Sequence, residues 1–192
     1  ERLTVNYRTP KQIMSLAGDV LAAIDPEVEP PRSVRDGMPP WCRQVGVGEL
    51  AGVLPDLVAA ELAAVAEPAE DGSEDLAGAG RAAVVVPSAR LAEVTAALDS
   101  FAPGSAAGGT ASVLDSRVAV LTVQQTKGLE FDAVIVVDPG GMLAECARGA
   151  GDLYVALTRA TRRLGVVAVG PLPGVLARLP LLAAPSAVSS AE

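Results

Sequence analysis

The chain has 192 residues and a mass of 19.4 kDa, with 50% apolar and 20% charged residues, which predicts a globular protein with a buried core and excludes a disordered or collagen-like chain. Its formal net charge of −8 and its pI near 4.6 argue against a protein that coats nucleic acid through a basic surface. The absence of histidine excludes Ser-His-Asp and Cys-His catalysis, and the two distant cysteines, Cys42 and Cys146, support neither a disulfide framework nor a zinc site.

The N-terminal part predicts a short strand followed by an amphipathic helix. Residues 3–5 read as the end of a strand, and Thr9 and Pro10 supply an N-cap and a first-turn proline. Apolar residues then recur at helical spacing until the helix ends before Pro26. The proline-rich stretch 26–42 predicts irregular structure.

The middle of the chain predicts two strands, each followed by a helix. The continuous apolar run at 82–86 indicates one strand, and residues 43–47 are expected to form the other. An Ala/Leu-rich stretch at 49–66, interrupted at Pro55, and a periodic stretch at 91–98 indicate the helices.

Three polar segments are expected to lie outside the core. They are an acidic, mobile linker at 67–80, a flexible Gly/Ala/Ser segment at 102–112 and a disordered tail at 183–192. Eight acidic and no basic residues lie between positions 49 and 75, which equals the whole net charge. We therefore expect this acidic region to repel phosphate. Residues 1–182 are expected to form one domain.

The last third predicts further strands and a late helix. Apolar runs at 118–122, 133–137 and 164–169 indicate strands. Four apolar residues at helical spacing indicate the helix: Leu153, Ala156, Leu157 and Ala160. Continuous apolar strands interleaved with helices predict an α/β fold, with an open, doubly wound parallel sheet covered by helices on both faces.

A phosphate-binding loop is missing from this predicted fold. An α/β domain that hydrolyses ATP alone needs a loop such as GxxxxGK[ST], whose lysine and backbone amides hold the phosphates. The two lysines, Lys11 and Lys127, do not follow a glycine. Two short glycine pairs, at 78–80 and 149–151, do not complete a dinucleotide fingerprint.

Three strings occur in an order that is more specific than any one of them. They are NYRTP at 6–10, LTVQQTKGLEFD at 121–132 and LYVALTRA at 153–160. They resemble motifs IV, V and VI of superfamily 1 helicases of the UvrD/Rep type, in the second RecA-like domain. This resemblance covers roughly residues 3–170 and implies a RecA-like fold of the P-loop NTPase type.

A finer resemblance is to the HelD type, helicase-like bacterial factors that bind RNA polymerase. The interval between Tyr7 and Lys127 has no room for the large domain that UvrD-type enzymes insert between motifs IV and V. The strings PRSVRDG at 31–37 and PLP at 171–173 are also similar to HelD. The resemblance implies a C-terminal fragment of a larger protein whose Walker motifs precede it.

The motifs present residues suited to a nucleotide. Tyr7 and Arg8 leave a strand at its carboxyl end, where open α/β sheets place ligands, and Arg159 is expected to project from a helix away from its apolar stripe. By resemblance, Tyr7 stacks on adenine, Arg8 reaches the γ-phosphate, Glu130 bonds the ribose and Arg159 is an arginine finger. Gly128 allows close backbone approach.

Three residues of the second motif, Thr122, Gln124 and Lys127, are expected by resemblance to face the interdomain cleft or a nucleic-acid backbone. UvrD-type enzymes usually carry His where this chain has Gln124, which argues against DNA contact from this loop. A structural ion pair is the alternative for Lys127. Leu129 and Phe131 are expected in the core.

Other aromatic and basic side chains have weaker assignments. For Trp41 there are two alternatives, a surface on which bases stack and a buried packing role. Arg162 and Arg163 are expected to be surface or interdomain charges.

The resemblance implies an ATP-dependent helicase-family protein that uses Mg²⁺ held by another part of the protein. Its expected partners are a first RecA-like domain of the same protein and bacterial RNA polymerase, with weak contact to DNA for this part. The alternatives are a DNA-unwinding helicase and a non-catalytic interaction module. No membrane span or signal peptide is recognisable, which predicts a soluble cytoplasmic protein, and the isolated chain is expected to be inactive as an ATPase.

Overall fold

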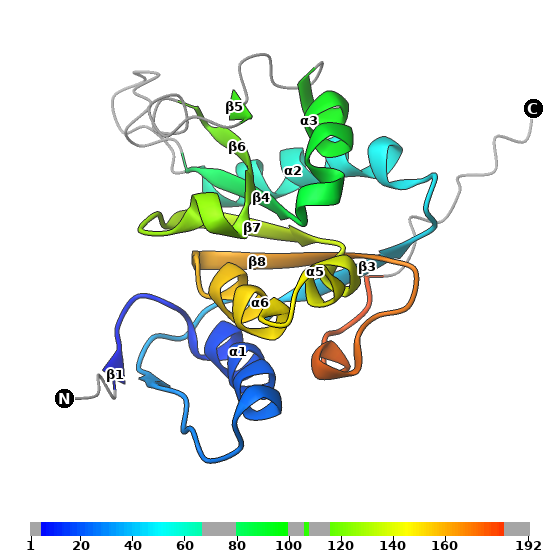
Figure 1. Cartoon of the computed structure of the whole chain (residues 1–192). Coiled ribbons are helices and arrows are strands. Elements are labelled where there is room, and N and C mark those ends of the chain that lie inside the picture. The colour runs from blue at the N-terminus through cyan, green and yellow to red at the C-terminus, as the bar shows by residue number, and fades with distance from the viewer. Residues whose placement is uncertain (1–4, 67–79, 100–105, 108–115, 183–192) are drawn as a thin grey trace, which may run out of the picture.

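The computed structural model describes residues 5–66, 80–99, 106–107 and 116–182. Its centre is a six-stranded sheet with the strand order β3-β8-β7-β4-β6-β5, in which every pair is parallel (Figure 1). The strands are β3 (Trp41–Val45), β4 (Ala82–Val86), β5 (Ala106–Ala107), β6 (Val118–Thr122), β7 (Phe131–Val137) and β8 (Ala160–Val169).

The apolar character of these strands follows from burial on both faces. Along β7, Val134 and Val136 belong to one core cluster, whereas Ile135 and Val137 belong to the other. Successive side chains of a strand point to opposite faces, so a strand covered on both sides must be apolar throughout.

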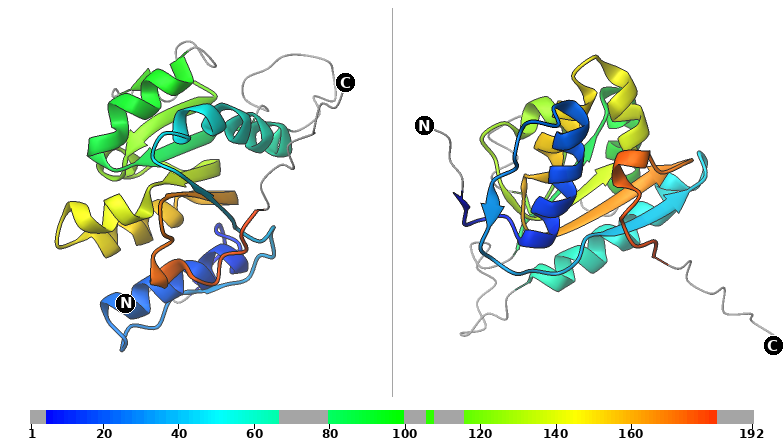
Figure 2. Two further views of the ribbon diagram at one scale, coloured as in Figure 1. Left: turned by 90° about the vertical axis from the view of Figure 1, so that its right-hand side faces the viewer. Right: turned by 90° about the horizontal axis from the view of Figure 1, so that it is seen from below.

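Helices cover both faces of the sheet, as the views in Figure 2 show. One face carries α1 (Lys11–Ile24), α5 (Pro139–Glu145) and α6 (Gly149–Leu157), and the other carries α2 (Leu50–Val65) and α3 (Leu91–Asp99). The prediction of a RecA-like α/β fold with an open parallel sheet is confirmed.

A separate two-stranded sheet is formed by the segments before and after α1. It pairs β1 (Val5–Asn6) with β2 (Arg32–Ser33) in parallel, away from the main sheet. Pro10, not Thr9, occupies the N-cap of α1. Thr9 is buried instead, where its hydroxyl accepts a hydrogen bond from the Asn6 amide.

The interruption expected at Pro55 is not observed, because α2 runs without a break from Leu50 to Val65. The missing N–H of Pro55 leaves the carbonyl of Ala51 without its helical donor. Ala51 lies exposed in the first turn, where water can supply the missing hydrogen bond.

Other boundaries differ from the sequence prediction. The late helix ends at Leu157, and Ala160 is the first residue of β8. The helix α5 was not predicted, and Ala106–Ala107 forms β5 inside the segment expected to be flexible. The linker at 67–79 and the tail at 183–192 lie outside the described residues.

An ion pair between buried Glu61 of α2 and partly buried Arg163 of β8 corrects the expectation that Arg163 is a surface or interdomain charge. Arg163 donates from Nε to Oε2 of Glu61 at 2.7 Å and from Nη2 to Oε1 at 3.0 Å. The indole of Trp41 donates to the same Oε1 at 2.8 Å. The guanidinium of Arg163 is therefore paired and is not a free surface charge. The carboxylate of Glu61 is bonded within the protein and is not solvated. The hydrogen bond to Glu61 raises the pKa of Arg163. Arg162 likewise donates to the carbonyl of Val65 at 3.1 Å.

Trp41 packs over a glycine of the neighbouring strand. Its register partner is Gly165, and a Cβ at that glycine would overlap the indole ring. Trp41 as a residue is 9% exposed, which confirms the packing role and excludes a stacking surface for bases. None of the helices in the described part of the chain is long and apolar enough to cross a membrane.

We predict that Glu61→Ala lowers the free energy of unfolding by about 3–5 kcal/mol, because it leaves a partly buried guanidinium and an indole N–H without their acceptor. Denaturant unfolding of the purified chain measures this change. The matched control is Asp56→Ala on the exposed side of the same helix, with an expected change within about 0.5 kcal/mol. Equal effects of the two substitutions would contradict a stabilising role for the pair.

Candidate functional site

A tight turn after β1 presents the first two candidate residues. The Asn6 side chain accepts hydrogen bonds from the backbone N–H of Arg8 at 2.9 Å and of Thr9 at 3.0 Å. This side-chain turn bends the backbone so that Tyr7 and Arg8 project outward. The Tyr7 ring is 72% exposed, so it is not part of the core.

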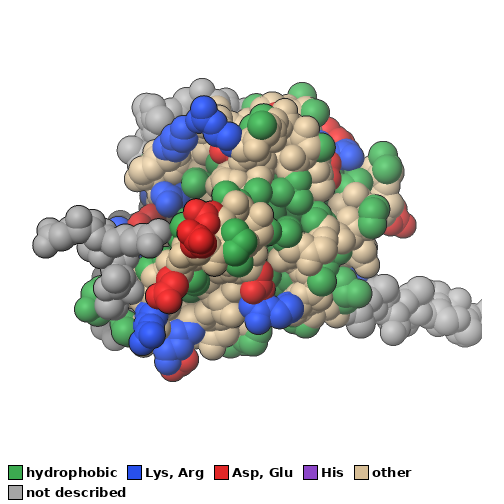
Figure 3. Space-filling view, turned by 60° about the horizontal axis from the view of Figure 1, so that its bottom comes forward, with side chains coloured by type: hydrophobic (Ala, Val, Ile, Leu, Met, Phe, Trp, Pro, Cys, Tyr) green, Lys and Arg blue, Asp and Glu red, His purple; other side chains and the backbone are tan. Residues whose placement is uncertain are grey.

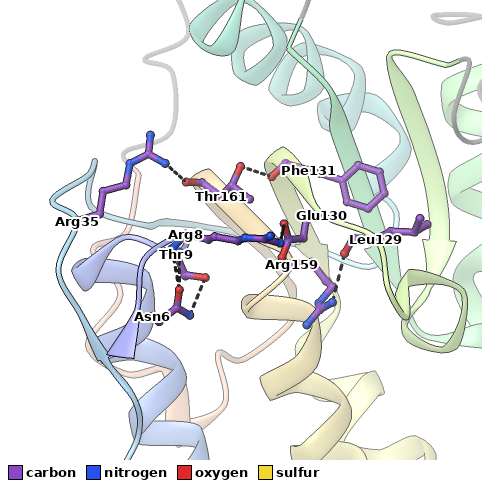
Figure 4. Close-up of polar contacts among 9 residues, drawn as sticks. All are labelled: Asn6, Arg8, Thr9, Arg35, Leu129, Glu130, Phe131, Arg159 and Thr161. Carbon is purple, nitrogen blue, oxygen red and sulfur yellow. Dashed lines mark hydrogen bonds and ion pairs between the residues drawn. The ribbon is translucent and has the colours of Figure 1, made fainter. Parts of the chain in front are cut away.

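Arg8 reaches a residue 122 positions away in the sequence. Its Nη1 atom donates to Oε2 of Glu130 at 2.7 Å (Figure 4). The two side chains are 73% and 40% exposed, and such an exposed pair contributes about 0–1 kcal/mol to stability. The pair matters more for the position of both side chains than for holding the fold together.

The loop that carries Glu130 is rigid at its start and has one special backbone position. The N–H and the hydroxyl of Thr122 both donate to the amide oxygen of Gln125, at 2.8 and 3.1 Å. The buried Thr126 hydroxyl donates to the Val123 carbonyl at 2.7 Å. Gly128 then adopts a φ of 79°, a left-handed conformation that glycine enters without strain.

Arg159 lies in the turn between α6 and β8, which corrects the prediction that it projects from a helix. Its Nε donates to the carbonyl of Val155 and its Nη1 to the carbonyl of Leu129, both at 3.2 Å. These bonds fix the guanidinium beside the loop of Glu130. Burial raises the pKa of the neighbouring Tyr154, and the charge of Arg159 acts in the opposite direction.

The structure brings Arg8, Glu130 and Arg159 together, but at the amino edge of the main sheet. Glu130 directly precedes β7 and Arg159 directly precedes β8. The prediction of a site at the carboxyl edge is wrong, because β1 does not belong to the main sheet. The loop that begins at Thr122 also crosses the length of the sheet to reach the start of β7.

Thr122, Gln124 and Lys127 lie apart from this group. Gln124 donates to the carboxylate of Asp152 at 3.2 and 3.3 Å. Gln124, Lys127 and Asp152 line a hollow of about 370 Å³ together with Cys146, Ala147 and Arg148. Among the described residues, no carboxylate pairs with Lys127, so the alternative of a structural ion pair is not observed.

Leu129 and Phe131 flank the carboxylate of Glu130 on the core side. Phe131 is buried, as predicted, whereas Leu129 is half-buried against the same cluster. A backbone hydrogen bond connects Phe131 to the third motif, since the N–H of Phe131 donates to the carbonyl of Arg159 at 3.0 Å.

The sequence analysis assigned no role to two exposed residues beside this site. Val34 is 55% exposed, and its N–H donates to the carbonyl of Asn6, next to Tyr7. Arg35 donates from Nη1 to the carbonyl of Thr161 at 3.4 Å. Both residues belong to the PRSVRDG string, which was the one available signal, but no residue within it had a predicted role.

Comparisons with known proteins agree with this architecture. Residues 117–167 match the family model of the UvrD-like helicase C-terminal domain. A solved structure, the C-terminal domain of a possible DNA helicase from Lactobacillus plantarum WCFS1, is similar with a TM-score of 0.63 and 25% identity, over 92% of this chain and 98% of that one. No curated protein matched the chain. The segment from β6 to β8 is thus similar in sequence to the UvrD-like helicase C-terminal domain, and the chain shares the fold of the C-terminal domain of a possible DNA helicase.

Proposed function

We propose that this chain supplies one half of an ATP-binding and ATP-hydrolysing site in a helicase-family protein, and that a first RecA-like domain of the same protein supplies the other half. The observation that supports this proposal is the convergence of Arg8, Glu130 and Arg159, from three distant segments, at one edge of the sheet. Two guanidinium groups, a carboxylate and an exposed aromatic ring complement the phosphates, ribose and base of a nucleotide.

Each side chain has a role that fits its surroundings. Tyr7 stacks on the adenine, because its ring is exposed and belongs to no core cluster. Arg8 contacts the γ-phosphate and Glu130 the ribose. Gly128 lets the loop backbone pass close to the ligand, since no described atom lies within 4 Å of the position its Cβ would take.

The ion pair between Arg8 and Glu130 is compatible with these roles. Both side chains are exposed, so exchanging one partner for a ligand costs little free energy. A nucleotide that bonds both groups replaces the pair with two charge-assisted contacts.

Arg159 is suited to stabilise a transferring phosphoryl group. Two of its N–H groups donate hydrogen bonds to backbone carbonyls, and these bonds fix the position of the guanidinium before the ligand arrives. Guanidinium has five N–H donors, so further donors remain for phosphate oxygens. A prepositioned cation needs no reorganisation when charge develops in the transition state.

The Mg²⁺ that accompanies ATP would be held by the other half of the site. No cluster of three or more His, Cys, Asp or Glu side chains suitable for a metal ion exists in the part of the chain that the structure describes. The chain also lacks a GxxxxGK[ST] loop. We therefore expect the isolated chain to be inactive as an ATPase.

For the whole protein we propose the HelD type, in which ATP-driven closure of the cleft remodels or releases bacterial RNA polymerase in the cytoplasm. The support is the short interval between Tyr7 and Lys127, whose described helices and strands, from α1 to β6, belong to the main sheet, to the helices that cover it or to the small β1–β2 sheet. The alternative is a DNA-unwinding helicase, which the description of the similar Lactobacillus plantarum structure favours.

Surface charge bears on the choice between these functions. Figure 3 shows the side of the molecule that carries α1, and on this face basic and acidic side chains are interspersed. Strong sequence-independent DNA binding needs a continuous basic surface that displaces counterions. This face is therefore poorly suited to bind DNA on its own.

We predict that Arg159→Ala, in the protein with both RecA-like domains, lowers kcat for ATP hydrolysis at least ~10²-fold, on the scale of a lost arginine finger. The lost hydrogen bonds to Val155 and Leu129 should also lower the free energy of unfolding by about 1–2 kcal/mol. Steady-state kinetics and denaturant unfolding measure the two effects separately.

The control for this prediction is Arg162→Ala, which also removes a hydrogen bond from a guanidinium to a carbonyl but lies outside the site. We expect this substitution to leave kcat within about twofold of the value for the unchanged protein, which corresponds to a change in activation free energy below ~0.5 kcal/mol. If Arg159→Ala behaved like this control, Arg159 would have a structural role only.

We predict that Tyr7→Ala weakens ATP binding by about 1–3 kcal/mol, the scale of base stacking on an aromatic ring. Tyr7→Phe keeps the ring and should bind ATP as the unchanged protein does. Because Tyr7 is 72% exposed, neither substitution should change stability by more than ~0.5 kcal/mol. Isothermal titration with a non-hydrolysable ATP analogue measures the affinities, and equal affinity for Ala and Phe would exclude stacking.

We predict that the chain binds single-stranded and duplex DNA no more tightly than about 1 μM at physiological salt, the tight end of non-specific binding. Fluorescence anisotropy measures this affinity. In parallel, the intact protein should co-elute with purified bacterial RNA polymerase in size-exclusion chromatography. Submicromolar, salt-sensitive DNA binding without co-elution would favour the DNA-unwinding helicase.

A further inference from the structure

The segment that contains β2 runs directly beside the turn of Tyr7 and Arg8. The N–H of Val34 donates to the carbonyl of Asn6 at 3.3 Å, and the Ser33 hydroxyl donates to the carbonyl of Thr9 at 2.5 Å. The N–H of Lys11 donates to the carbonyl of Arg35 at 2.8 Å. Residues 33–35 are thus bonded at three points to the segment that carries Arg8.

The side chain of Arg35 extends from this segment to the start of β8. Its Nη1 donates to the carbonyl of Thr161, and the Thr161 hydroxyl donates to the carbonyl of Phe131 at 3.1 Å (Figure 4). Thr161 follows Arg159 by two positions, and Phe131 directly follows Glu130. Arg35 therefore ends next to the two strand starts that carry the other site residues.

A β-bulge provides the carbonyl that accepts the hydrogen bond from Arg35. The register between β7 and β8 shifts between Phe131 and Ala133, so that Phe131 pairs with Ala160 but Ala133 pairs with Arg163. The extra residue of a bulged strand lies outside the regular ladder. The bond from Arg35 to Thr161 is long, at 3.4 Å, so the guanidinium is oriented there but held weakly.

Three arginines reach the region of these two strand starts. Arg8, Arg35 and Arg159 come from three different segments, and Glu130 is the one carboxylate that pairs with any of them among the described residues. Neighbouring charges of one sign raise the local potential and attract a polyanion. Planar guanidinium groups are also the side chains best matched to phosphate.

We propose that Arg35 is a further phosphate-binding residue of the nucleotide site, acting beside Arg8 on the polyphosphate chain. This inference rests on the function proposed above. The weak bond to Thr161 orients the guanidinium before the ligand arrives and yields to a phosphate oxygen when it does.

The test uses inorganic triphosphate as the probe and the 192-residue chain as the protein. The size of the chain suits amide ¹H–¹⁵N correlation spectra, in which the titration reports both the affinity and the residues affected. We expect chemical-shift changes at Tyr7, Arg8, Glu130 and Arg159. Arg35→Ala should weaken triphosphate binding at least fivefold.

The matched control is Arg32→Ala. Arg32 is equally exposed, lies three residues earlier and makes no ion pair with a described residue, so its removal changes the net charge by the same amount. We expect its triphosphate affinity to stay within twofold of the unchanged chain. Unchanged resonances in α3 and β6 verify that both variants are folded.

The outcomes separate this inference from the proposed function. Shifts at Arg8, Glu130 and Arg159 with equal affinity for the Arg35 and Arg32 variants would overturn the role of Arg35 and leave the nucleotide site in place. Equal weakening by both variants would reduce the effect to net charge and also overturn it. Absence of shifts at all four site residues would overturn both proposals.

Discussion

Parallel pairing of β7 with β8 is the constraint on which the candidate site depends. Phe131 and Ala160 are register partners at the start of the two strands, so the residues just before them, Glu130 and Arg159, must lie at the same edge. Backbone hydrogen bonding fixes this proximity before any side chain contributes. Arg8 then needs only a short turn, formed by the Asn6 side chain, to reach the same place.

Stability and the candidate site rely on different groups. The exposed pair between Arg8 and Glu130 adds little to stability and can exchange its partners. The pair between buried Glu61 and partly buried Arg163 carries the indole of Trp41 as a third member and joins α2 to β3 and β8. This firmly bonded pair lies on the face of the sheet that α2 covers, whereas the exchangeable pair lies at the amino edge.

Sequence reasoning predicted the parts of the fold that burial dictates. Strands buried on both faces must be apolar throughout, so β4 and β6 were predicted at their observed positions. The late helix was predicted too long because Ala160 continues a helical spacing by chance, although it begins a strand. Periodicity within one segment does not contain the pairing with β7 that decides this boundary.

Three of the residues predicted for one site lie together in the structure, but not at the predicted edge of the sheet. The three motif strings identified Arg8, Glu130 and Arg159, whereas the edge of the sheet depends on which strands join the main sheet, a long-range property. The burial of Glu61 was missed for a similar reason, since its partner Arg163 lies 102 positions away. Local composition makes Glu61 one acid among eight, and only the fold distinguishes it.

The packing of Trp41 on Gly165 also limits how this part of the chain can vary among relatives. Any side chain at position 165 collides with the indole, so a larger residue there requires a smaller one at position 41. A smaller residue at position 41 would also remove an N–H donor from Glu61 and so change the environment of Arg163. Positions 41, 61, 163 and 165 should therefore co-vary as one group, and an alignment of relatives would show them as mutually dependent columns.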